Sequence, residues 1–179
     1  MEDSILIAGF GGQGVLFTGR LLAEAGLISG HQVTWYPSYG PEQRGGTCNC
    51  SVVISHEPIG SPVIDEPDFL LVLNQPSWAR FAPHARENGL VIYNSNIVRP
   101  DKSLVLASAV PIPATKLAEE AGDERVANMV LLGALLRQQH RVPMALAKEA
   151  LQALISPKYA DLLNIDLRCL DLGYAYAGS

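Results

Sequence analysis

A glycine-rich loop near the start of the chain contains residues of the kind that bind phosphate. Gly9, Gly11 and Gly14 follow the spacing G-x-G-x-x-G, directly after an apolar run and directly before a helical pattern. Glycine permits a tight turn and close approach of the backbone, and the N-terminus of the following helix offers free N–H groups to an anion. The loop is therefore predicted to bind a phosphate or pyrophosphate group. Glycines that only let a helix pack closely on a strand would give the same pattern.

The segment that follows the second predicted strand argues against NAD. A dinucleotide-binding fold places Asp or Glu at the end of that strand to bind the ribose hydroxyls. Residues 33–37 contain no acid, and no nearby arginine suits NADP. Gln13 is a further departure, because its side-chain amide can both donate and accept hydrogen bonds to a ligand. A free-standing NAD(P) reductase is therefore the weaker hypothesis for this loop.

A second unusual loop, residues 37–46, contributes a hydroxyl, a phenol, a carboxylate and a guanidinium, from Ser38, Tyr39, Glu42 and Arg44. Because it follows the second predicted strand, it should lie beside the first loop at the carboxyl edge of the sheet. Arg44 could bind a phosphate or carboxylate with two hydrogen bonds. Equally, Glu42 and Arg44 could form a surface ion pair or contact a neighbouring subunit.

The alternation of strand and helix patterns predicts an α/β fold of the Rossmann or flavodoxin type, doubly wound, with a mostly parallel sheet and a helical C-terminal third. Strands are predicted over residues 4–8, 32–36, 48–54, 69–73, 90–93 and 104–106, and helices over 15–28, 76–85, 113–121, 125–139 and 143–155. Residues 1–179 are expected to form one domain, with 156–179 as a helical tail. The apolar face of that tail, with Leu162, Leu163 and Leu170, is a candidate contact with a partner chain.

Composition narrows the function classes. The formal charge of −5, without a basic run, gives no reason to expect nucleic acid or a membrane as partner. No apolar run is long enough to cross a bilayer, and the acidic start does not resemble a signal peptide, so a cytoplasmic location is expected. The 3 cysteines are too few for an iron–sulfur cluster. No metal site and no complete catalytic set is expected in this chain.

Cysteine, histidine and tryptophan side chains are further candidates for chemical roles. Cys48 and Cys50 lie on one face of a predicted strand, so small buried hydrophobic groups are expected rather than a redox pair. The histidines are dispersed and expected to be exposed, and the two tryptophans are expected in the core or at an interface: His31, His56, His84, His140, Trp35 and Trp78. The segment from Asn74 to Ser77 ends the fourth strand. It either lines the ligand cleft or begins the next helix, with Ser77 favoured as its cap.

Two motifs together resemble a known family. The run from Gly11 to Val15, and the run Pro-Ser-Tyr-Gly-Pro-Glu-Gln-Arg-Gly-Gly-Thr over residues 37–47, are similar to the gamma subunit of 2-oxoacid:ferredoxin oxidoreductases. The second motif is much the more specific. Residues 57–62 and 73–77 are also similar to that family, and the resemblance covers residues 4–155. It is strongest to the 2-oxoglutarate or branched-chain 2-oxoacid type.

The resemblance implies oxidative decarboxylation of a 2-oxoacid, with 2-oxoglutarate expected, to an acyl-CoA with reduction of ferredoxin. Thiamine diphosphate and iron–sulfur clusters would lie in the partner alpha, beta and possibly delta subunits, and the gamma subunit would help to bind coenzyme A (CoA). Carried over by position, Gly12, Gln13 and Gly14 would meet the CoA phosphates or pantetheine, and Asn128 matches an asparagine near the same site. With residues from the two loops, the candidate CoA-binding set is Gly11, Gly12, Gln13, Gly14, Ser38, Tyr39, Arg44 and Asn128. A stand-alone nucleotide- or CoA-binding regulatory module is the alternative. The 2-oxoacid pocket would lie in the other subunits, so this chain does not identify the substrate.

Overall fold

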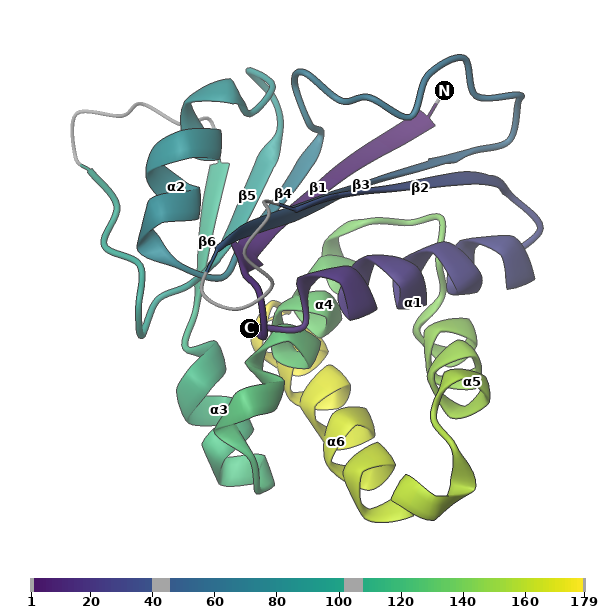
Figure 1. Ribbon diagram of the computed structural model, residues 1–179, viewed down its shortest axis with the longest axis vertical. Helices are drawn as coiled ribbons and strands as arrows, with labels where there is room; N and C mark the ends of the chain where they lie inside the picture. Colours follow the sequence, from purple (N-terminus) through teal and green to yellow (C-terminus); the bar gives the residue numbers. More distant parts are fainter. Residues whose placement is uncertain (1, 40–45, 102–107, 179) are drawn as a thin grey trace.

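The computed structural model describes residues 2–39, 46–101 and 108–178, which form one mixed sheet with helices on both faces (Figure 1). The strands are β1 (Glu2–Phe10), β2 (Gln32–Tyr39), β3 (Thr47–Ser55), β4 (Phe69–Val72), β5 (Leu90–Asn94) and β6 (Ser108–Ile112). The helices are α1 (Val15–Ile28), α2 (Gln75–Phe81), α3 (Ala114–Ala121), α4 (Ala127–Gln138), α5 (Met144–Leu154) and α6 (Ala160–Tyr176). Short 3₁₀ turns cover Ala82–His84, Glu124–Val126 and Pro157–Tyr159.

The strand order is β2-β3-β1-β4-β5-β6. The neighbours β1–β4, β4–β5 and β5–β6 are parallel, whereas β3 is antiparallel to both β1 and β2. All strands except β3 therefore run in one direction, which confirms the expected α/β class with a mostly parallel sheet. The β2–β3 hairpin places the end of β2 and the start of β3 at the same edge as the end of β1.

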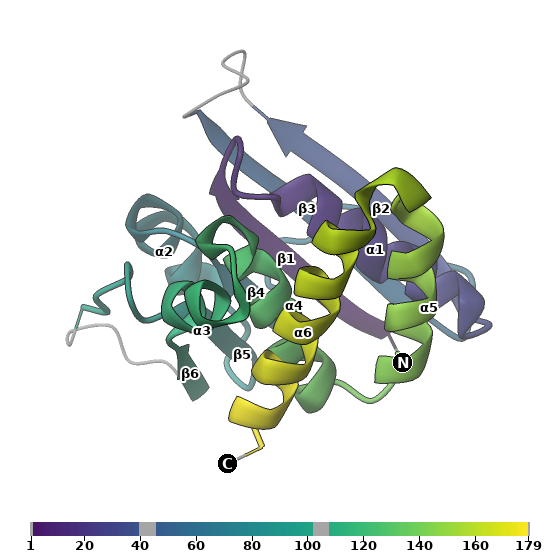
Figure 2. The same cartoon turned by 90° about the horizontal axis from the view of Figure 1, so that it is seen from below.

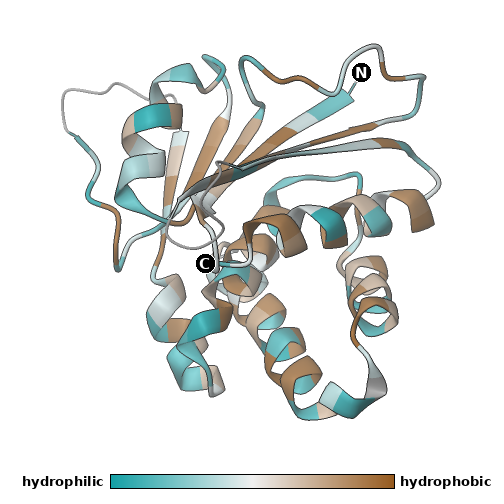
Figure 3. Cartoon of the chain, in the orientation of Figure 1, coloured by the Kyte–Doolittle hydropathy of each residue, from teal (hydrophilic) through white to brown (hydrophobic). Residues whose placement is uncertain are grey.

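Two apolar cores lie on opposite faces of this sheet. The larger core lies between the sheet and α1, α3, α4, α5 and α6, and the smaller one lies under α2, with Leu70, Val72, Trp78 and Val91. Strands β4 and β5 are buried on both faces, because helices cover both of their sides, and they are mostly brown in Figure 3. This is the pattern expected of central parallel strands.

The C-terminal helix packs on its own chain. Gly133 of α4 and Gly173 of α6 allow backbone contact between the two helices, since a Cβ at either position would collide with a carbonyl of the other helix. Figure 2 shows α6 beside α4. Leu170 is fully buried there, whereas Leu162 stays 39% exposed. The expectation that this face of the tail meets a partner chain is therefore wrong at Leu170, whose partner is α4.

Other expectations needed correction. Residues 37–39 continue β2 rather than starting a loop, because their backbone pairs with residues 48–50 of β3. The strand predicted at 104–106 lies outside the described residues, and β6 is formed by Ser108–Ile112. The strand pattern of β6 is weak because Pro111 interrupts it. Proline is tolerated only where no ladder hydrogen bond is needed from its nitrogen, as on this edge strand.

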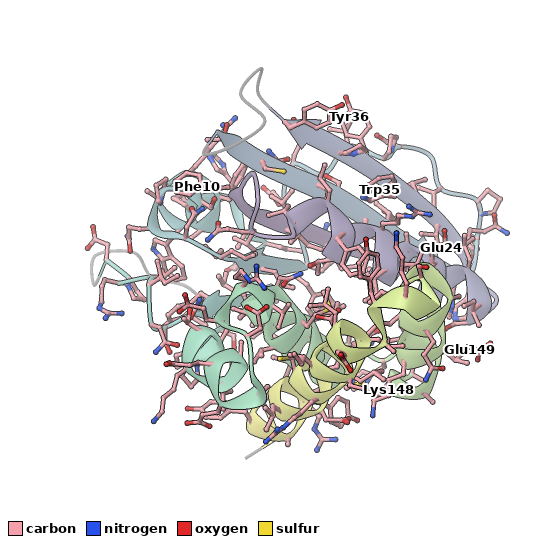
Figure 4. The ribbon with its side chains drawn as sticks, turned by 60° about the horizontal axis from the view of Figure 1, so that its bottom comes forward. Phe10, Glu24, Trp35, Tyr36, Lys148 and Glu149 are labelled. Atoms are coloured by element: carbon pink, nitrogen blue, oxygen red, sulfur yellow. The ribbon has the colours of Figure 1, made fainter. Side chains whose placement is uncertain are left out.

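Three predictions about individual side chains met different outcomes. Cys48 and Cys50 are buried, as expected, and burial raises the pKa of Cys50 to about 12. His31 is buried rather than exposed, with its ring 4.4 Å from that of His56. Trp78 is in the core beneath α2, whereas Trp35 lies partly exposed on edge strand β2, next to Tyr36 (Figure 4).

Candidate functional site

The glycine loop connects the end of β1 to the start of α1, and its own hydrogen bonds fix its shape. The N–H of Gln13 donates to the carbonyl of Phe10 at 3.1 Å, and the N–H of Gly11 donates to the carbonyl of Gly46 at 3.1 Å. Figure 4 labels Phe10, where the loop begins. The second bond ties the loop to the residue just before β3. The expected proximity of the two loops is therefore seen at Gly46, whereas Arg44 lies outside the described residues.

The side chain of Gln13 turns back onto the protein. Its Oε1 accepts a 2.7 Å hydrogen bond from the N–H of Phe10 and a 2.8 Å bond from Nδ2 of Asn74. The carbonyl of this side chain is thus occupied within the protein. Of the two roles foreseen for the amide, acceptor and donor, only donation from its NH₂ group remains for a ligand.

The three glycines that line or support the loop serve different purposes. A Cβ on Gly9 would lie 2.9 Å from Oε1 of Gln13, and a Cβ on Gly14 would collide with the amide of Asn128. Gly14 also has φ +75° and Gly12 has φ +98°, both in the region that favours glycine. A Cβ on Gly12 would meet nothing within 4 Å. Close packing therefore explains Gly9 and part of Gly14, but at Gly12 the space beside the backbone is open.

Asn128 joins α4 to the start of α1. Its Nδ2 donates to Oγ1 of Thr18 at 3.0 Å and lies 3.5 Å from the carbonyl of Gly14, and the residue is 6% exposed. Thr18 Oγ1 itself donates to the carbonyl of Gly14 at 2.9 Å. Thr18 is the first residue of α1 whose N–H donates to a carbonyl along the helix, that of Gly14. The N–H groups of residues 15–17, in the first turn, therefore point out of the end of the helix.

Three pockets meet at Gly12, and each borders a different part of the loop. The α4 pocket, about 350 Å³, is lined by Gly12, Gln13, Leu73, Asn94, Ile97, Thr115, Glu124, Arg125, Ala127, Asn128 and Leu131. The β2 pocket, about 490 Å³, is lined by Phe10, Gly11, Gly12, Gly14, Val15, Leu16, Phe17, Tyr39 and Cys48. The α6 pocket, about 440 Å³, is lined by Gly12, Gly14, Phe17, Arg125, Val126, Asn128, Leu154, Ile155, Ser156, Tyr159, Leu162 and Asp166.

The structure brings most of the candidate site residues together and separates one of them. Each of six candidate residues borders at least one of these three pockets: Gly11, Gly12, Gln13, Gly14, Tyr39 and Asn128. Ser38 instead lines a pocket of about 370 Å³ on the opposite face of the sheet, with Leu6, Asn49 and Ser51. Successive residues of a strand point to opposite faces, so Ser38 and Tyr39 of β2 cannot both reach one site on a single face.

Charged groups are few around the loop. Arg125 borders the α4 and α6 pockets, and its guanidinium donates to both carboxylate oxygens of Asp123. The hydrogen bonds from Arg125 lower the pKa of Asp123 to about 2. Asp166, at the inner wall of the α6 pocket, is buried, and burial followed by the charge of Asp123 raises its pKa to about 6. An anion at the loop would therefore be bound mainly by backbone N–H groups.

Sequence reasoning missed three of these groups. Asn74, rather than Ser77, caps α2: its Oδ1 accepts from the N–H of Ser77 at 2.9 Å while its Nδ2 holds Gln13. Arg125 and Asp166 were not identified either. A signal for Asp166 does exist, because the spacing of Leu162, Asp166 and Leu170 places a carboxylate in the middle of a helix's apolar stripe.

The described residues contain no group of three or more His, Cys, Asp or Glu side chains placed to bind a metal ion. Nor does this part of the chain include a helix with the length and apolar character needed to cross a membrane. The candidate site consists of a loop, a helix N-terminus and three pockets.

Comparison with known proteins identifies relatives over nearly the whole chain. The family model described as pyruvate ferredoxin/flavodoxin oxidoreductase matches residues 4–176. Ketoisovalerate oxidoreductase subunit VorA of Methanothermobacter marburgensis is 48% identical over 75% of this chain, which spans only 28% of that relative's length. The gamma subunit of a keto/oxoacid ferredoxin oxidoreductase from Geobacter sulfurreducens has a similar crystal structure, with a TM-score of 0.85, 27% identity and coverage of 99% of this chain and 97% of that one.

A further solved structure resembles this chain over 99% of its length. It is the 2-oxoglutarate:ferredoxin oxidoreductase from Magnetococcus marinus, solved with 2-oxoglutarate, coenzyme A and succinyl-CoA bound. The TM-score is 0.90 at 26% identity, and the likeness covers 31% of that chain. In two of these three proteins, therefore, the segment similar to this chain is about a third of the relative or less.

Proposed function

Because this chain belongs to the pyruvate ferredoxin/flavodoxin oxidoreductase family, we propose that it is the gamma subunit of a 2-oxoacid:ferredoxin oxidoreductase and that it contributes to binding CoA. The complete enzyme would convert a 2-oxoacid and CoA to an acyl-CoA and CO₂, and pass the two electrons released to ferredoxin. Both ketoisovalerate and 2-oxoglutarate occur in the names of similar proteins. The proposal therefore names the class, a 2-oxoacid, and leaves open the substrate first expected, 2-oxoglutarate.

The division of labour between subunits is part of the proposal. Within the described residues there is no cluster of side chains placed to bind a metal ion, and the three cysteines are buried. Thiamine diphosphate and the iron–sulfur clusters would accordingly belong to alpha, beta and delta partners.

The observation that carries the CoA assignment is the convergence of three pockets on Gly12, beside the open first turn of α1. CoA contains a diphosphate in the middle of a long molecule, with the adenosine arm on one side and the pantetheine arm on the other. A loop with free helix N–H groups suits the diphosphate. Pockets on several sides of that loop suit the two arms. The absence of an acid at the end of β2, where residues 36–39 are Tyr-Pro-Ser-Tyr, favours CoA over NAD.

Two measurements test this function. First, the tagged chain is isolated from its host; recovery with larger, iron-containing partners is expected, and a lone monomer in the cell extract would contradict the proposal. Second, the purified complex is titrated with CoA and with NAD by calorimetry. We expect CoA to bind more tightly than NAD. Tighter binding of NAD would refute the ligand assignment.

Two variants test the site within that complex. Gln13→Ala removes the side chain that accepts the hydrogen bond from the N–H of Phe10, and Asn128→Ala removes the amide that contacts the carbonyl of Gly14. Each should weaken CoA binding by about tenfold, the effect of losing one hydrogen bond to or behind a charged group. Gln32→Ala and Asn164→Ala are the matched controls, because both residues are exposed and neither lines a pocket at the loop. CoA affinity equal to that of the controls would refute the site.

A further inference from the structure

Asp166 is a buried carboxylate without a partner. The residue lies on the inward face of α6 and is 4% exposed, and within the part of the chain that the structure describes its carboxylate receives no hydrogen bond or ion pair. Its oxygens are not among the fully enclosed polar atoms without a partner and open onto the α6 pocket. The neighbouring charge is unfavourable, because it comes from Asp123. A buried carboxylate without a donor is costly for a fold, and a well-packed protein of this size contains few such groups. A ligand in the pocket that Asp166 borders can supply the hydrogen-bond donor that the described residues do not.

The α6 pocket is the space that Asp166 borders. Its walls are mostly apolar or aromatic, with Phe17 from α1, Leu154 and Ile155 from the end of α5, and Tyr159 and Leu162 before and on α6. Gly12 and Gly14, next to the start of α1, also line the pocket, as does Arg125. The pocket thus combines mostly apolar walls, the carboxylate of Asp166, the guanidinium of Arg125 and the glycines of the proposed phosphate site.

These features fit one end of CoA better than the other. The thiol of CoA is its reacting group, and the proposed function places the thiamine chemistry in another subunit, so the pantetheine arm would extend toward that subunit. The adenosine arm takes no part in the chemistry and can be held within this chain. The apolar walls suit an aromatic base, and the carboxylate suits an N–H donor on that base. The same carboxylate repels phosphate, which places the phosphates toward Gly12 and α1.

We propose that the α6 pocket binds the adenine base of CoA and that Asp166 accepts a hydrogen bond from the exocyclic amine of that base. This inference rests on the proposed CoA function and adds to it the determinant of base specificity. The acid that recognises the nucleoside would then come from the last helix of the chain rather than from the end of β2.

The test compares CoA with its hypoxanthine analogue, in which a carbonyl replaces the exocyclic amine. Affinities for both are measured by calorimetry on the assembled complex. The native complex should bind CoA about tenfold or more tightly than the analogue, because the analogue turns an acceptor toward a carboxylate. Asp166→Leu removes the acceptor while filling a similar volume, and should bring the two affinities close to equality.

The controls separate base recognition from charge and folding. Asp161→Asn removes the same charge from an exposed position on the same helix and should keep the native preference for CoA. If the leucine variant does not assemble, Asp166→Asn takes its place. The Asn amide can donate to the carbonyl of the analogue, so the preference for CoA over the analogue should also fall. A native complex that binds both nucleotides equally, or an Asp166 variant that retains the native preference, would overturn this inference alone. A native complex that binds neither would refute the CoA function itself.

Discussion

Nδ2 of Asn74 donates a 2.8 Å hydrogen bond to Oε1 of Gln13 and so ties the end of β4 to the glycine loop. The Oδ1 of the same amide accepts from the N–H of Ser77 and caps α2. The buried side chain of Asn74 therefore orients the loop and also caps the N-terminus of α2 on the other face of the sheet. The loop geometry depends on a residue that is 61 positions away in the sequence.

Replacing Asn74 should destabilise the protein and loosen the loop. Asn74→Ala removes the cap and the bond to Gln13, and should lower the free energy of unfolding by about 2 kcal/mol in urea unfolding. Asn74→Asp keeps an acceptor for Ser77 but cannot donate to Gln13, so it should cost less stability while still weakening CoA binding. Equal losses of stability in the Ala and Asp variants would show that the cap on α2 contributes nothing measurable, and native CoA affinity in Asn74→Asp would show that the bond to Gln13 is unimportant for the loop.

Glycine-to-alanine changes should separate backbone strain from steric collision in the loop. Gly12→Ala meets open space and should cost about 1 kcal/mol, because only its positive φ is disfavoured. Gly14→Ala adds a collision with the amide of Asn128 and should cost more. Adding Asn128→Ala to Gly14→Ala should recover part of the loss. Strict additivity of the two changes in urea unfolding would contradict this contact.

The carboxyl of Asp166 should make the protein less stable as the pH rises. Its pKa in the folded state, about 6, lies above the ordinary value of 3.8. Its contribution to stability is therefore fully present below pH 3.8 and is lost as the pH rises through 6. Relative to the native protein, Asp166→Asn should gain about 2–4 °C in melting temperature at pH 7–8 and little near pH 4. A pH-independent difference, or one matched by Asp161→Asn, would contradict the shifted pKa.

His31 should have the opposite pH dependence. Burial, followed by the neighbouring His56 and Arg141, lowers its pKa below 6.5. The stability that depends on neutral His31 is thus present above pH 6.5 and is lost as the pH falls toward the folded-state pKa. Nδ1 of His31 is buried without a partner among the described residues. His31→Phe should reduce the loss of melting temperature between pH 7 and pH 5, because phenylalanine cannot be protonated. His140→Phe, at an exposed position, should leave the native pH profile unchanged.

The three thiols should be inert in the folded protein. Burial raises the pKa of Cys50 to about 12 and that of Cys169 to about 11, and it also raises the pKa of Cys48. The thiolate is the reactive form, so a disulfide reagent at pH 8 should modify none of them rapidly until denaturant is added. Rapid modification of a native thiol would identify a local opening, and mass spectrometry would locate it.

The sequence by itself determined the local features of this protein. The apolar period and Gly30 defined α1 as residues 15–28, and both limits agree with the structure. The glycine spacing located the loop between β1 and α1. These features depend on residues close together in the chain, where helical periodicity and glycine conformation act directly. The two family motifs are local in the same sense.

The tertiary structure decided what the loop faces. The antiparallel direction of β3 and the formation of β6 around Pro111 depend on pairing with distant strands, which no local pattern specifies. The alternation along β2 sends Ser38 to the opposite face of the sheet from the loop, although Tyr39 beside it borders the site. Asn74, Asn128 and Asp166 reach the loop or its pockets only because β4, α4 and α6 pack there. Side chains far apart in sequence became neighbours through burial of apolar faces, and that long-range packing is the part that local residue patterns leave undetermined.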